Sequence, residues 1–426
     1  MAEIPPARAS ILPAIATTFL VGCGFAALKF VLIGRIALDW DPSNPASLEA
    51  IPWQWLRDVL LNSHAKGTFE EATSQSMSVV LTLGLLIGFP INGPLAGAWR
   101  CDRLFAVSSA LVGFGCIMAL FSNPWVWACF IGIAYGAACS ARGKIVPLLS
   151  LASGSSNTRV SGGINAALAI GLIAGTISGS FISQALPGHP LVQHGILVTI
   201  AAIAVGSALF IRVPEPQTTP FAQGLKDFFR ATGLLFRHHW PLLAGGGLAW
   251  GITAAASLAM YVHANQDLGL LRGPASTLAG IAAAGAILGN VVSHHYTRRR
   301  YVGAAFVLLA VALAAYPYVA VNLPSAACMV FCIGFLFAAP ANVLDAKFLA
   351  NAHEDGLAGL GGTVMSFVHS FAILAIGISL AVPLFLGLMR AHDQFWVLAG
   401  IALVSSLATI WAKLGDSCSG APLLRP

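Results

Sequence analysis

The segment Gly93-Pro-Leu-Ala-Gly-Ala-Trp-Arg-Cys-Asp-Arg103 joins two long apolar stretches of the chain, near residues 76–98 and 104–122. A related segment, Gly289-Asn-Val-Val-Ser-His-His-Tyr-Thr-Arg-Arg-Arg300, follows 196 residues later and again joins two apolar stretches. Each segment begins with a glycine and ends in basic residues. Because glycine lets two helices approach closely, the pattern predicts a tight, positively charged turn between helices that occurs twice in the chain.

The composition defines the class of protein. Only 9% of the 426 residues are charged, whereas 57% are hydrophobic. Soluble proteins contain roughly 25% charged residues, so this chain has too few polar side chains to cover a water-soluble particle. The composition excludes a soluble enzyme and a nucleic-acid-binding protein, and it predicts a membrane protein. The formal net charge of +6 then indicates which loops face the cytoplasm.

Twelve apolar stretches are long enough to cross a bilayer, which takes about 20 residues each. They run near 11–37, 76–98, 104–122, 124–149, 160–186, 190–211, 241–263, 274–293, 301–322, 324–346, 357–388 and 393–413. Most connections between them are too short to hold a separate domain. We therefore expect an all-α membrane protein with twelve transmembrane helices packed as one bundle.

Basic residues are distributed unevenly over the two ends of these predicted helices. If the N-terminus is cytoplasmic, the inward segments hold fourteen Lys and Arg residues and the outward segments hold five. Cytoplasmic loops carry the excess of positive charge, so both termini are predicted to be cytoplasmic. All tryptophans except Trp250 lie near predicted helix ends or in connections, as expected for side chains that prefer the headgroup zone.

Two further features repeat at nearly the same spacing as the basic turn. Gly136 and Gly334 are 198 residues apart, and Gly162-Gly163 and Gly361-Gly362 are 199 residues apart. Duplicated bundles are common in transporters. Since six helices return the chain to its starting side, the two predicted halves are parallel.

Two long connections complete the predicted domain organisation. Phe221–Trp240 places apolar residues at helical spacing opposite basic ones, the pattern of an amphipathic helix on a membrane surface. The Ile51–Leu61 stretch is expected to form a second interfacial helix, either inert or covering the substrate path. We predict an N-terminal half over 1–212 with an outward insertion at 38–75, a cytoplasmic linker over 213–240 and a C-terminal half over 241–426.

Two six-helix halves with a glycine and basic turn after the second helix resemble the major facilitator superfamily. Its turn has the pattern G-x-L-A-D-x-x-G-R-[KR], and five positions are matched here, by Gly93, Leu95, Ala96, Arg100 and Arg103. Gly97 occupies the usual aspartate position. The resemblance implies charged groups that pair across the cytoplasmic gap when the carrier faces outward. Asp102 is expected to supply the missing negative charge, the alternative being an ordinary solvated turn.

Within that superfamily the chain resembles the bacterial lysophospholipid transporters over most of its length outside 38–75. The matching stretches are Ala249–Gly251 with Ala279–Asn290, Ser140–Lys144, Pro340–Asn342 and Gly356–Ile376. A lysine of that family in the fourth helix corresponds to Lys144, and an asparagine in the tenth to Asn342. Several charged or polar positions of the family are not kept, and they correspond to Phe25, Ala166, Ser257, Phe367 and Val368 here.

The resemblance implies secondary transport by alternating access, in which a lysophospholipid crosses a bacterial inner membrane for re-acylation. An acyltransferase acting in trans and membrane lipids would be its partners. The chain contains no G-x-x-x-x-G-K-[ST] loop, nucleophile elbow or HExxH motif, so we expect no enzymatic function, cofactor or metal. The open alternatives are a carrier for another anionic amphiphile or a small organic acid, and a non-transporting assembly factor with the same fold.

Polar residues inside the apolar stretches are the candidate substrate-binding residues, because an ion in the bilayer core is costly and usually functional. We predict that Lys29 and Lys144 bind the phosphate, together with Asn165, Asn342 and His369. Lys29 has the alternative of extending toward the headgroups. The His369 imidazole is a candidate for coupling to protons, and otherwise a packing residue.

The remaining polar residues are predicted gating residues. Arg142 lies two residues from Lys144 on one helix, so the two cannot share a face, and Arg142 is expected to turn toward Asp102. The alternative is that both cations anchor the cytoplasmic headgroup zone. Asp345 and Lys347 are expected to form a structural or gating ion pair. The full predicted gating set is Gly93, Arg100, Asp102, Arg103, Arg142, Asp345 and Lys347.

Overall fold

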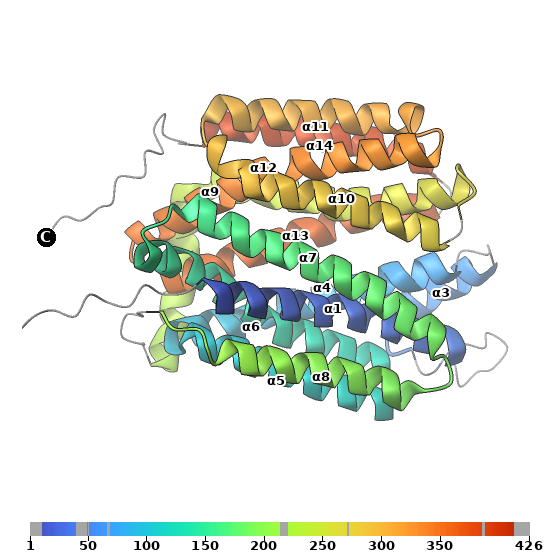
Figure 1. The fold of residues 1–426 in the computed structure, drawn as a ribbon, viewed down its shortest axis with the longest axis horizontal. Helices are drawn as coiled ribbons and strands as arrows, with labels where there is room; N and C mark the ends of the chain where they lie inside the picture. The colour runs from blue at the N-terminus through green and yellow to red at the C-terminus, as the bar shows by residue number, and fades with distance from the viewer. Residues whose placement is uncertain are drawn as a thin grey trace, which may run out of the picture.

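The structure is a computed structural model that describes residues 11–39, 49, 51–65, 69–213, 220–270, 272–385 and 388–412. These residues form helices and turns, without strands. The long helices lie side by side along the long axis of the bundle, with a short helix, α3 (Gln54–Ala65), at one end (Figure 1). Leu12 and Trp411 lie at the other end. We name these the α3 end and the terminal end.

The helices follow the predicted order. The N-terminal half contains α1 (Leu12–Asp39), α4 (Phe69–Ala98), α5 (Cys101–Phe121), α6 (Pro124–Ser153), α7 (Asn157–Ala185) and α8 (Pro190–Ala208). The C-terminal half contains α9 (Phe221–Gln266), α10 (Arg272–Val292), the 3-10 helix η1 (Ser293–His295), α11 (Arg299–Val319), α12 (Leu323–Glu354), α13 (Ala358–Phe385) and α14 (Ala391–Trp411). Among the described residues, eleven helices are long and apolar enough to cross a membrane. The 21-residue α10 lies in the place of the eighth predicted span.

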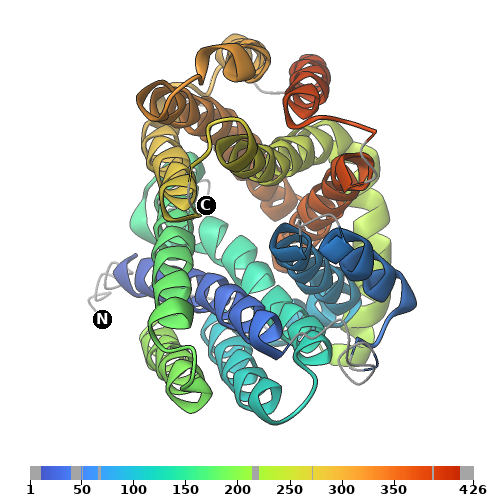
Figure 2. The same cartoon turned by 90° about the vertical axis from the view of Figure 1, so that its right-hand side faces the viewer.

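The two halves repeat the same packing, which is visible from the α3 end in Figure 2. α1 packs on α7 as α9 packs on α13, α4 packs on α6 as α10 packs on α12, and α5 packs on α8 as α11 packs on α14. The halves meet where α4 contacts α13 and where α7 contacts α10, which are again equivalent pairs. The predicted all-α membrane fold with two parallel six-helix halves is confirmed.

Glycines set the distance between helices within each half. Gly171, Gly175 and Gly179 of α7 lie directly against the backbone of α1, at Phe19, Cys23 and Ala27. A Cβ at any of these glycines would collide with that backbone, so the stripe permits a close helix crossing. α1 and α7 are therefore tightly packed against each other within the N-terminal half.

The glycine of the N-terminal half that is equivalent to Gly334 lies one helical turn away from the glycine that the sequence spacing predicts. Gly132 of α6 lies against the carbonyl of Leu81, just as Gly334 of α12 lies against the carbonyl of Ala282. The structure therefore pairs Gly334 with Gly132, whereas the sequence spacing paired it with Gly136. Gly136 instead leaves space for the amide of Asn92.

The connection between the halves continues directly into the seventh span. α9 is helical from Phe221, and non-helical angles at His239 (φ −124°, ψ 17°) mark a kink. Pro241 explains the kink, because its ring clashes with the carbonyl of the preceding turn. The segment before the kink lies where we expected the amphipathic linker, while 214–219 lie outside the described residues. α4 begins at Phe69, so part of the expected 38–75 insertion belongs to this helix.

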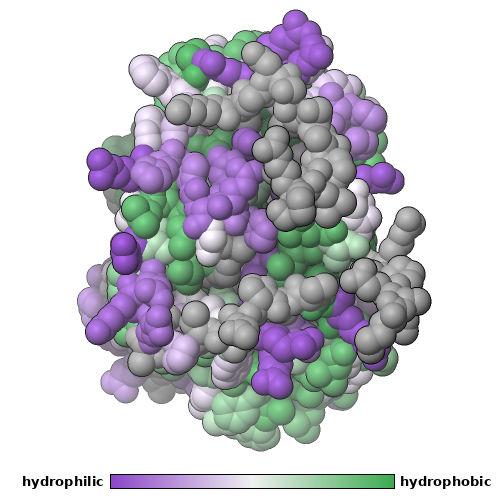
Figure 3. Space-filling model, turned by 90° about the vertical axis from the view of Figure 1, so that its left-hand side faces the viewer, coloured by the Kyte–Doolittle hydropathy of each residue, from purple (hydrophilic) through white to green (hydrophobic). Residues whose placement is uncertain are grey.

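Basic residues mark the terminal end of the bundle. Hydrophilic residues form several patches on this face (Figure 3). The exposed basic residues at the helix ends and turns here include Arg100, Arg103, Arg159, Arg237, Arg298, Arg299 and Arg300. At the α3 end, Arg35 and Arg57 are half-buried and Arg390 is exposed. The described residues thus show the charge asymmetry that the sequence predicts.

Replacing Gly334 by Ala is expected to destabilise the protein, because the added Cβ collides with the carbonyl of Ala282. Extra atoms in a packed contact typically cost about 1–3 kcal/mol. Gly400→Ala on α14 is the matched control, since a Cβ at this position meets nothing within 4 Å and alanine favours the helix. Thermal unfolding of the purified variants should show a lower midpoint for Gly334→Ala only. Equal midpoints for the two variants would contradict the close α10–α12 crossing.

Candidate functional site

A cavity of about 790 Å³ lies between the two halves. Its walls come from α1, α4 and α7 on one side and α9, α10, α12 and α13 on the other. Gln184 and Pro187, at the α3 end of α7 and just beyond it, also line the cavity. The cavity therefore reaches toward the α3 end. Its volume falls within the range of about 300–1,000 Å³ that is usual for small-molecule sites.

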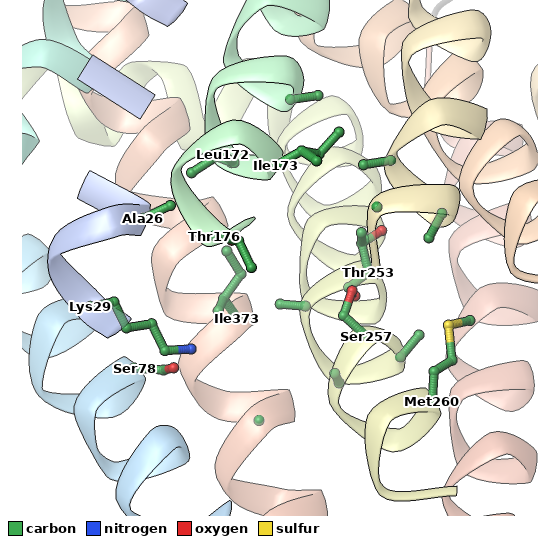
Figure 4. A pocket seen from close by; sticks show the side chains of 18 of the residues that line it. Ala26, Lys29, Ser78, Leu172, Ile173, Thr176, Thr253, Ser257, Met260 and Ile373 are labelled. Carbon is green, nitrogen blue, oxygen red and sulfur yellow. The ribbon is translucent and has the colours of Figure 1, made fainter. Parts of the chain in front are cut away.

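Lys29 is the only charged side chain of the described residues that lines this cavity. Its amine extends from α1 toward Ser78 of α4, while Thr253 and Ser257 lie on the opposite wall (Figure 4). Lys29 Nζ lies 5.6 Å from the centroid of the Phe30 ring. No carboxylate of the described residues pairs with it, so the cation is available to a ligand.

Hydroxyl groups supply most of the remaining polarity of the α9 wall. Thr253 Oγ1 donates to the carbonyl of Ala249 at 3.1 Å, and Ser257 Oγ donates to the carbonyl of Thr253 at 2.8 Å. Because each hydroxyl proton is used within the helix, the oxygen lone pairs are left for the cavity. The cavity thus has a cation on the α1 wall and hydrogen-bond acceptors on the α9 wall.

A buried polar cluster around Asn342 of α12 closes the cavity on its terminal side. Asn342 Oδ1 accepts hydrogen bonds from Ser161 Oγ at 2.7 Å and Asn165 Nδ2 at 2.9 Å, both on α7. Asn342 Nδ2 donates to Ser293 Oγ at 2.6 Å and to the carbonyl of Thr158 at 3.1 Å. These bonds join α12 of one half to α7 of the other, and Asn165 also lines the cavity.

A glycine contact closes the same side between α6 and α13. Gly143 and Gly362 lie backbone to backbone, without space for a Cβ on either residue. Lys144, next to Gly143, is buried, and its Nζ donates to the carbonyl of Trp99 at 2.9 Å. The halves are therefore in contact at the terminal end, while the cavity between them extends toward the α3 end.

The five predicted substrate-binding residues do not all line the cavity in the structure. Lys29 and Asn165 line the cavity, and Asn342 lies next to it, bonded to Asn165. Lys144 does not line the cavity in this conformation, because the carbonyl of Trp99, which follows the last residue of α4, takes its amine. His369 lies behind the wall rather than in it.

Behind the cavity wall, Asp345 and His369 form a buried pair. Their side chains are 4% and 7% exposed, and His369 Nε2 lies 3.2 Å from Asp345 Oδ1. Trp250, which lines the cavity, donates from Nε1 to Asp345 Oδ2 at 3.0 Å. Its ring stacks on His369, with centroids 5.8 Å apart. Gly246 makes room for the pair, since a Cβ there would lie 2.7 Å from Asp345 Oδ1.

The predicted Asp345–Lys347 pair is not formed, and this prediction was wrong for the present conformation. Residues two apart on a helix point in different directions, and Asp345 faces α9 and α13 instead. The predicted Arg142–Asp102 pair is also not formed. Asp102 Oδ1 accepts from Arg100 Nε at 3.1 Å, because the tight turn between α4 and α5 brings these two together.

The other gating residues lie at the terminal end. Arg103 is exposed, and one guanidinium nitrogen of Arg142 is buried without a hydrogen-bond partner among the described residues. Gly93 packs under the ring of Phe228, so this glycine seats the first segment of α9 on α4. The glycine of the turn therefore serves the linker as well as the α4–α5 contact.

Several polar and aromatic residues that line the cavity were not predicted from the sequence, among them Trp250, Thr253, Ser257 and Asn290. Hydroxyl and amide side chains on an apolar helix give little signal, because most of them bond to their own helix. Trp250 did give a signal. It was the one tryptophan placed inside a predicted span, away from the membrane interfaces.

Comparison with known proteins gives the family. The family profile described as Major Facilitator Superfamily matches residues 14–376. The human organic anion transporter MFSD10 (TETRAN) has a TM-score of 0.75 and 14% sequence identity, over 95% of this chain and 100% of that chain. The MFS transporter FucP in the outward conformation has a TM-score of 0.59 and 14% identity, over 93% of this chain and 97% of that chain. No curated protein matches the sequence significantly.

Replacing Asn342 by Ala is expected to open the terminal end of the carrier. The change removes four hydrogen bonds and leaves buried partners unsatisfied, at a cost of about 1–3 kcal/mol. Spin labels at Leu151 of α6 and Glu354 of α12, both exposed, should report a longer distance between the halves.

Asn351→Ala is the matched control for this experiment. Asn351 lies on the same helix but contacts His239 of its own half, with Nδ2 3.4 Å from Nδ1. Its loss should leave the distance between the labels unchanged. An Asn342→Ala variant with the wild-type distance distribution would show that the cluster does not hold the halves together.

Proposed function

The chain belongs to the major facilitator superfamily and is a membrane transporter rather than an enzyme, and we propose that it carries an anionic amphiphile by alternating access. The observation that supports this substrate class is that Lys29 is the one cation, among the described residues, that lines a largely apolar cavity. An unpaired charge in such surroundings is costly. An anionic group of the substrate would compensate this charge.

The apolar walls favour an amphiphile over a small hydrophilic acid. Leu172, Ile173, Phe337 and Ile373 are among the apolar side chains that line the cavity. A small acid bound at Lys29 would leave most of this surface uncovered, whereas an acyl chain would cover it and gain hydrophobic stabilisation.

The α9 wall favours a headgroup with hydrogen-bond donors. Thr253 and Ser257 present acceptor oxygens opposite Lys29. A phosphate at Lys29 with a glycerol or ethanolamine group beside these hydroxyls would match both walls. A lysophospholipid, which the sequence resemblance also implies, has this combination of groups. MFSD10 is described as an organic anion transporter, which is compatible with the anionic class.

The charge asymmetry supports an orientation in the membrane. Basic residues at the terminal end support a cytoplasmic location for that end, because cytoplasmic segments carry the excess of positive charge. In a bacterial inner membrane, the cavity would then face the outer leaflet, and closure at the α3 end would bring the substrate to the inner side. Re-acylation there would need an acyltransferase acting in trans.

The test uses purified protein in liposomes that contain labelled lysophosphatidylglycerol. We expect wild-type protein to move the lipid into the inner leaflet, where albumin cannot extract it. Lys29→Met should lower the rate at subsaturating lipid about tenfold or more, because a hydrogen bond to a charged group contributes about 1.5–3 kcal/mol. Lys29→Arg should retain most of the rate.

Lys347→Met is the matched control, because it removes a cation of α12 that does not line the cavity. Transport of succinate without movement of the lysophospholipid would make a small organic acid the substrate. Absence of transport for both compounds by folded wild-type protein would favour a non-transporting assembly factor.

A further inference from the structure

We propose that Asp345 and His369 form a proton-binding site whose protonation changes the hydrogen bond of Trp250 in the cavity wall. The inference rests on the proposed anion transport and adds a second transported species, the proton. The proton site lies behind the wall of the substrate cavity, so proton and anion bind at separate places. The hydrogen bond from Trp250 Nε1 to Asp345 Oδ2, at 3.0 Å, connects them.

Because the Asp345–His369 pair is buried, its net charge strongly affects the free energy of this conformation. Both side chains are more than nine-tenths buried, and they lie within membrane-spanning helices. With a neutral imidazole and an ionised carboxylate, the pair has a net charge of −1, which is costly in the bilayer interior. Binding one proton converts the pair to a neutral one, either as imidazolium with carboxylate or as imidazole with carboxylic acid. The closed terminal end therefore favours the protonated pair.

Asp345 Oδ1 lies close to His369 Nε2, but the two atoms form no hydrogen bond in this geometry. His369 Nε2 and Asp345 Oδ1 are 3.2 Å apart. A small rotation of either side chain would join them through one hydrogen, carried by Nε2 or by Oδ1. Asp345 Oδ2 is already an acceptor, because the indole N–H of Trp250 can only donate. An additional proton can therefore bind at Asp345 Oδ1 or on the imidazole, next to its partner.

Among the described residues, the surrounding helices supply no other ion-pair partner. The described charged groups and histidines on α12 and on the elements packed against α12 and α13 are Arg142, Lys144, Arg159, Lys226, Asp227, Arg230, Arg237, His238, His239, His263, His294, His295, Arg299, Arg300, Lys347, His353 and Glu354. Among the described residues, none of them bonds to Asp345 or His369. Lys144 donates to Trp99, and His239 pairs with Asp355 at 2.9 Å. The proton is therefore the cation that can neutralise this site.

The same helices connect the site to the movement of the halves. His369 lies about two turns along α13 from Gly362, which touches Gly143 of the opposite half. Separation of the halves at this contact would let water from the terminal side approach α13. Hydration lowers the cost of an ionised carboxylate, so opening this side favours release of the proton. Binding from one side and release to the other is the property of a coupling site.

The first experiment needs no substrate. Protonation of Asp345 changes its hydrogen bond with Trp250, so the tryptophan fluorescence of purified protein should show a transition with pH. This transition should be absent in Asp345→Asn and in Trp250→Phe. It should persist in His263→Gln, the matched control, because His263 is another buried histidine with an aspartate partner, Asp267, but its ring contacts Tyr316 and Phe395 instead of Trp250. A transition that Asp345→Asn leaves unchanged would overturn the proposal.

The second experiment measures coupling in the same liposomes, with the membrane potential clamped. If one proton moves with each lysophosphatidylglycerol monoanion, a gradient of one pH unit should produce a roughly tenfold accumulation on the alkaline side. Asp345→Asn and His369→Gln should lose this accumulation while they retain exchange of labelled for unlabelled lipid. Retention of exchange shows that the variants are folded and bind the substrate.

The outcomes distinguish the two proposals. If wild-type protein does not move the lipid, the proposed substrate fails, while the fluorescence titration still tests the proton site. If wild-type protein moves the lipid without a response to the pH gradient, the coupling proposal is wrong and the transport proposal stands. Accumulation that both variants retain would also overturn the coupling proposal.

Discussion

The low dielectric constant of a bilayer interior requires that each polar group in a spanning helix finds a partner. Most buried groups of this protein satisfy that requirement within the chain. Lys144 bonds to the carbonyl of Trp99, and the amide of Asn342 makes four hydrogen bonds. Lys29 differs, because no carboxylate of the described residues pairs with it and it faces the cavity. The position of Lys29 therefore identifies the candidate substrate-binding site.

The contacts within each half differ in kind from the contacts between the two halves. Within the halves, glycines such as Gly175 and Gly334 bring helix backbones into contact over several turns, and dispersion forces there are large in sum. Between the halves at the terminal end, the contacts of the described residues include the polar cluster around Asn342, the Gly143–Gly362 approach and the approach of Gly162 to the carbonyl of Asn290. Hydrogen bonds between neutral groups contribute about 1 kcal/mol each. The interface between the halves can therefore separate while each half remains packed.

Hydropathy and spacing predicted the helices, the two halves and the charge asymmetry, because these features depend on composition along the chain. Pairwise contacts were harder to predict. By sequence, Lys144 is as suitable for the cavity as Lys29, but in the structure its amine donates to the carbonyl of Trp99. Asp345 was assigned to Lys347, its neighbour in sequence, whereas its partners come from α9 and α13. Which helix faces which residue depends on packing between segments that are distant in sequence, and one sequence does not contain this information directly.

The proton site lies within one half of the carrier, whereas the substrate cavity lies between the two halves, and this difference has a mechanical consequence. Lys29 belongs to α1 in the N-terminal half, whereas Asp345, His369 and Trp250 all belong to the C-terminal half. A rotation of one half against the other leaves the distances within the Asp345–His369–Trp250 group intact but changes the separation of Lys29 from the α9 wall. An anion held between Lys29 and the hydroxyls of α9 would thus depend on the relative position of the halves. The proton site, in contrast, responds to that position only through its access to water.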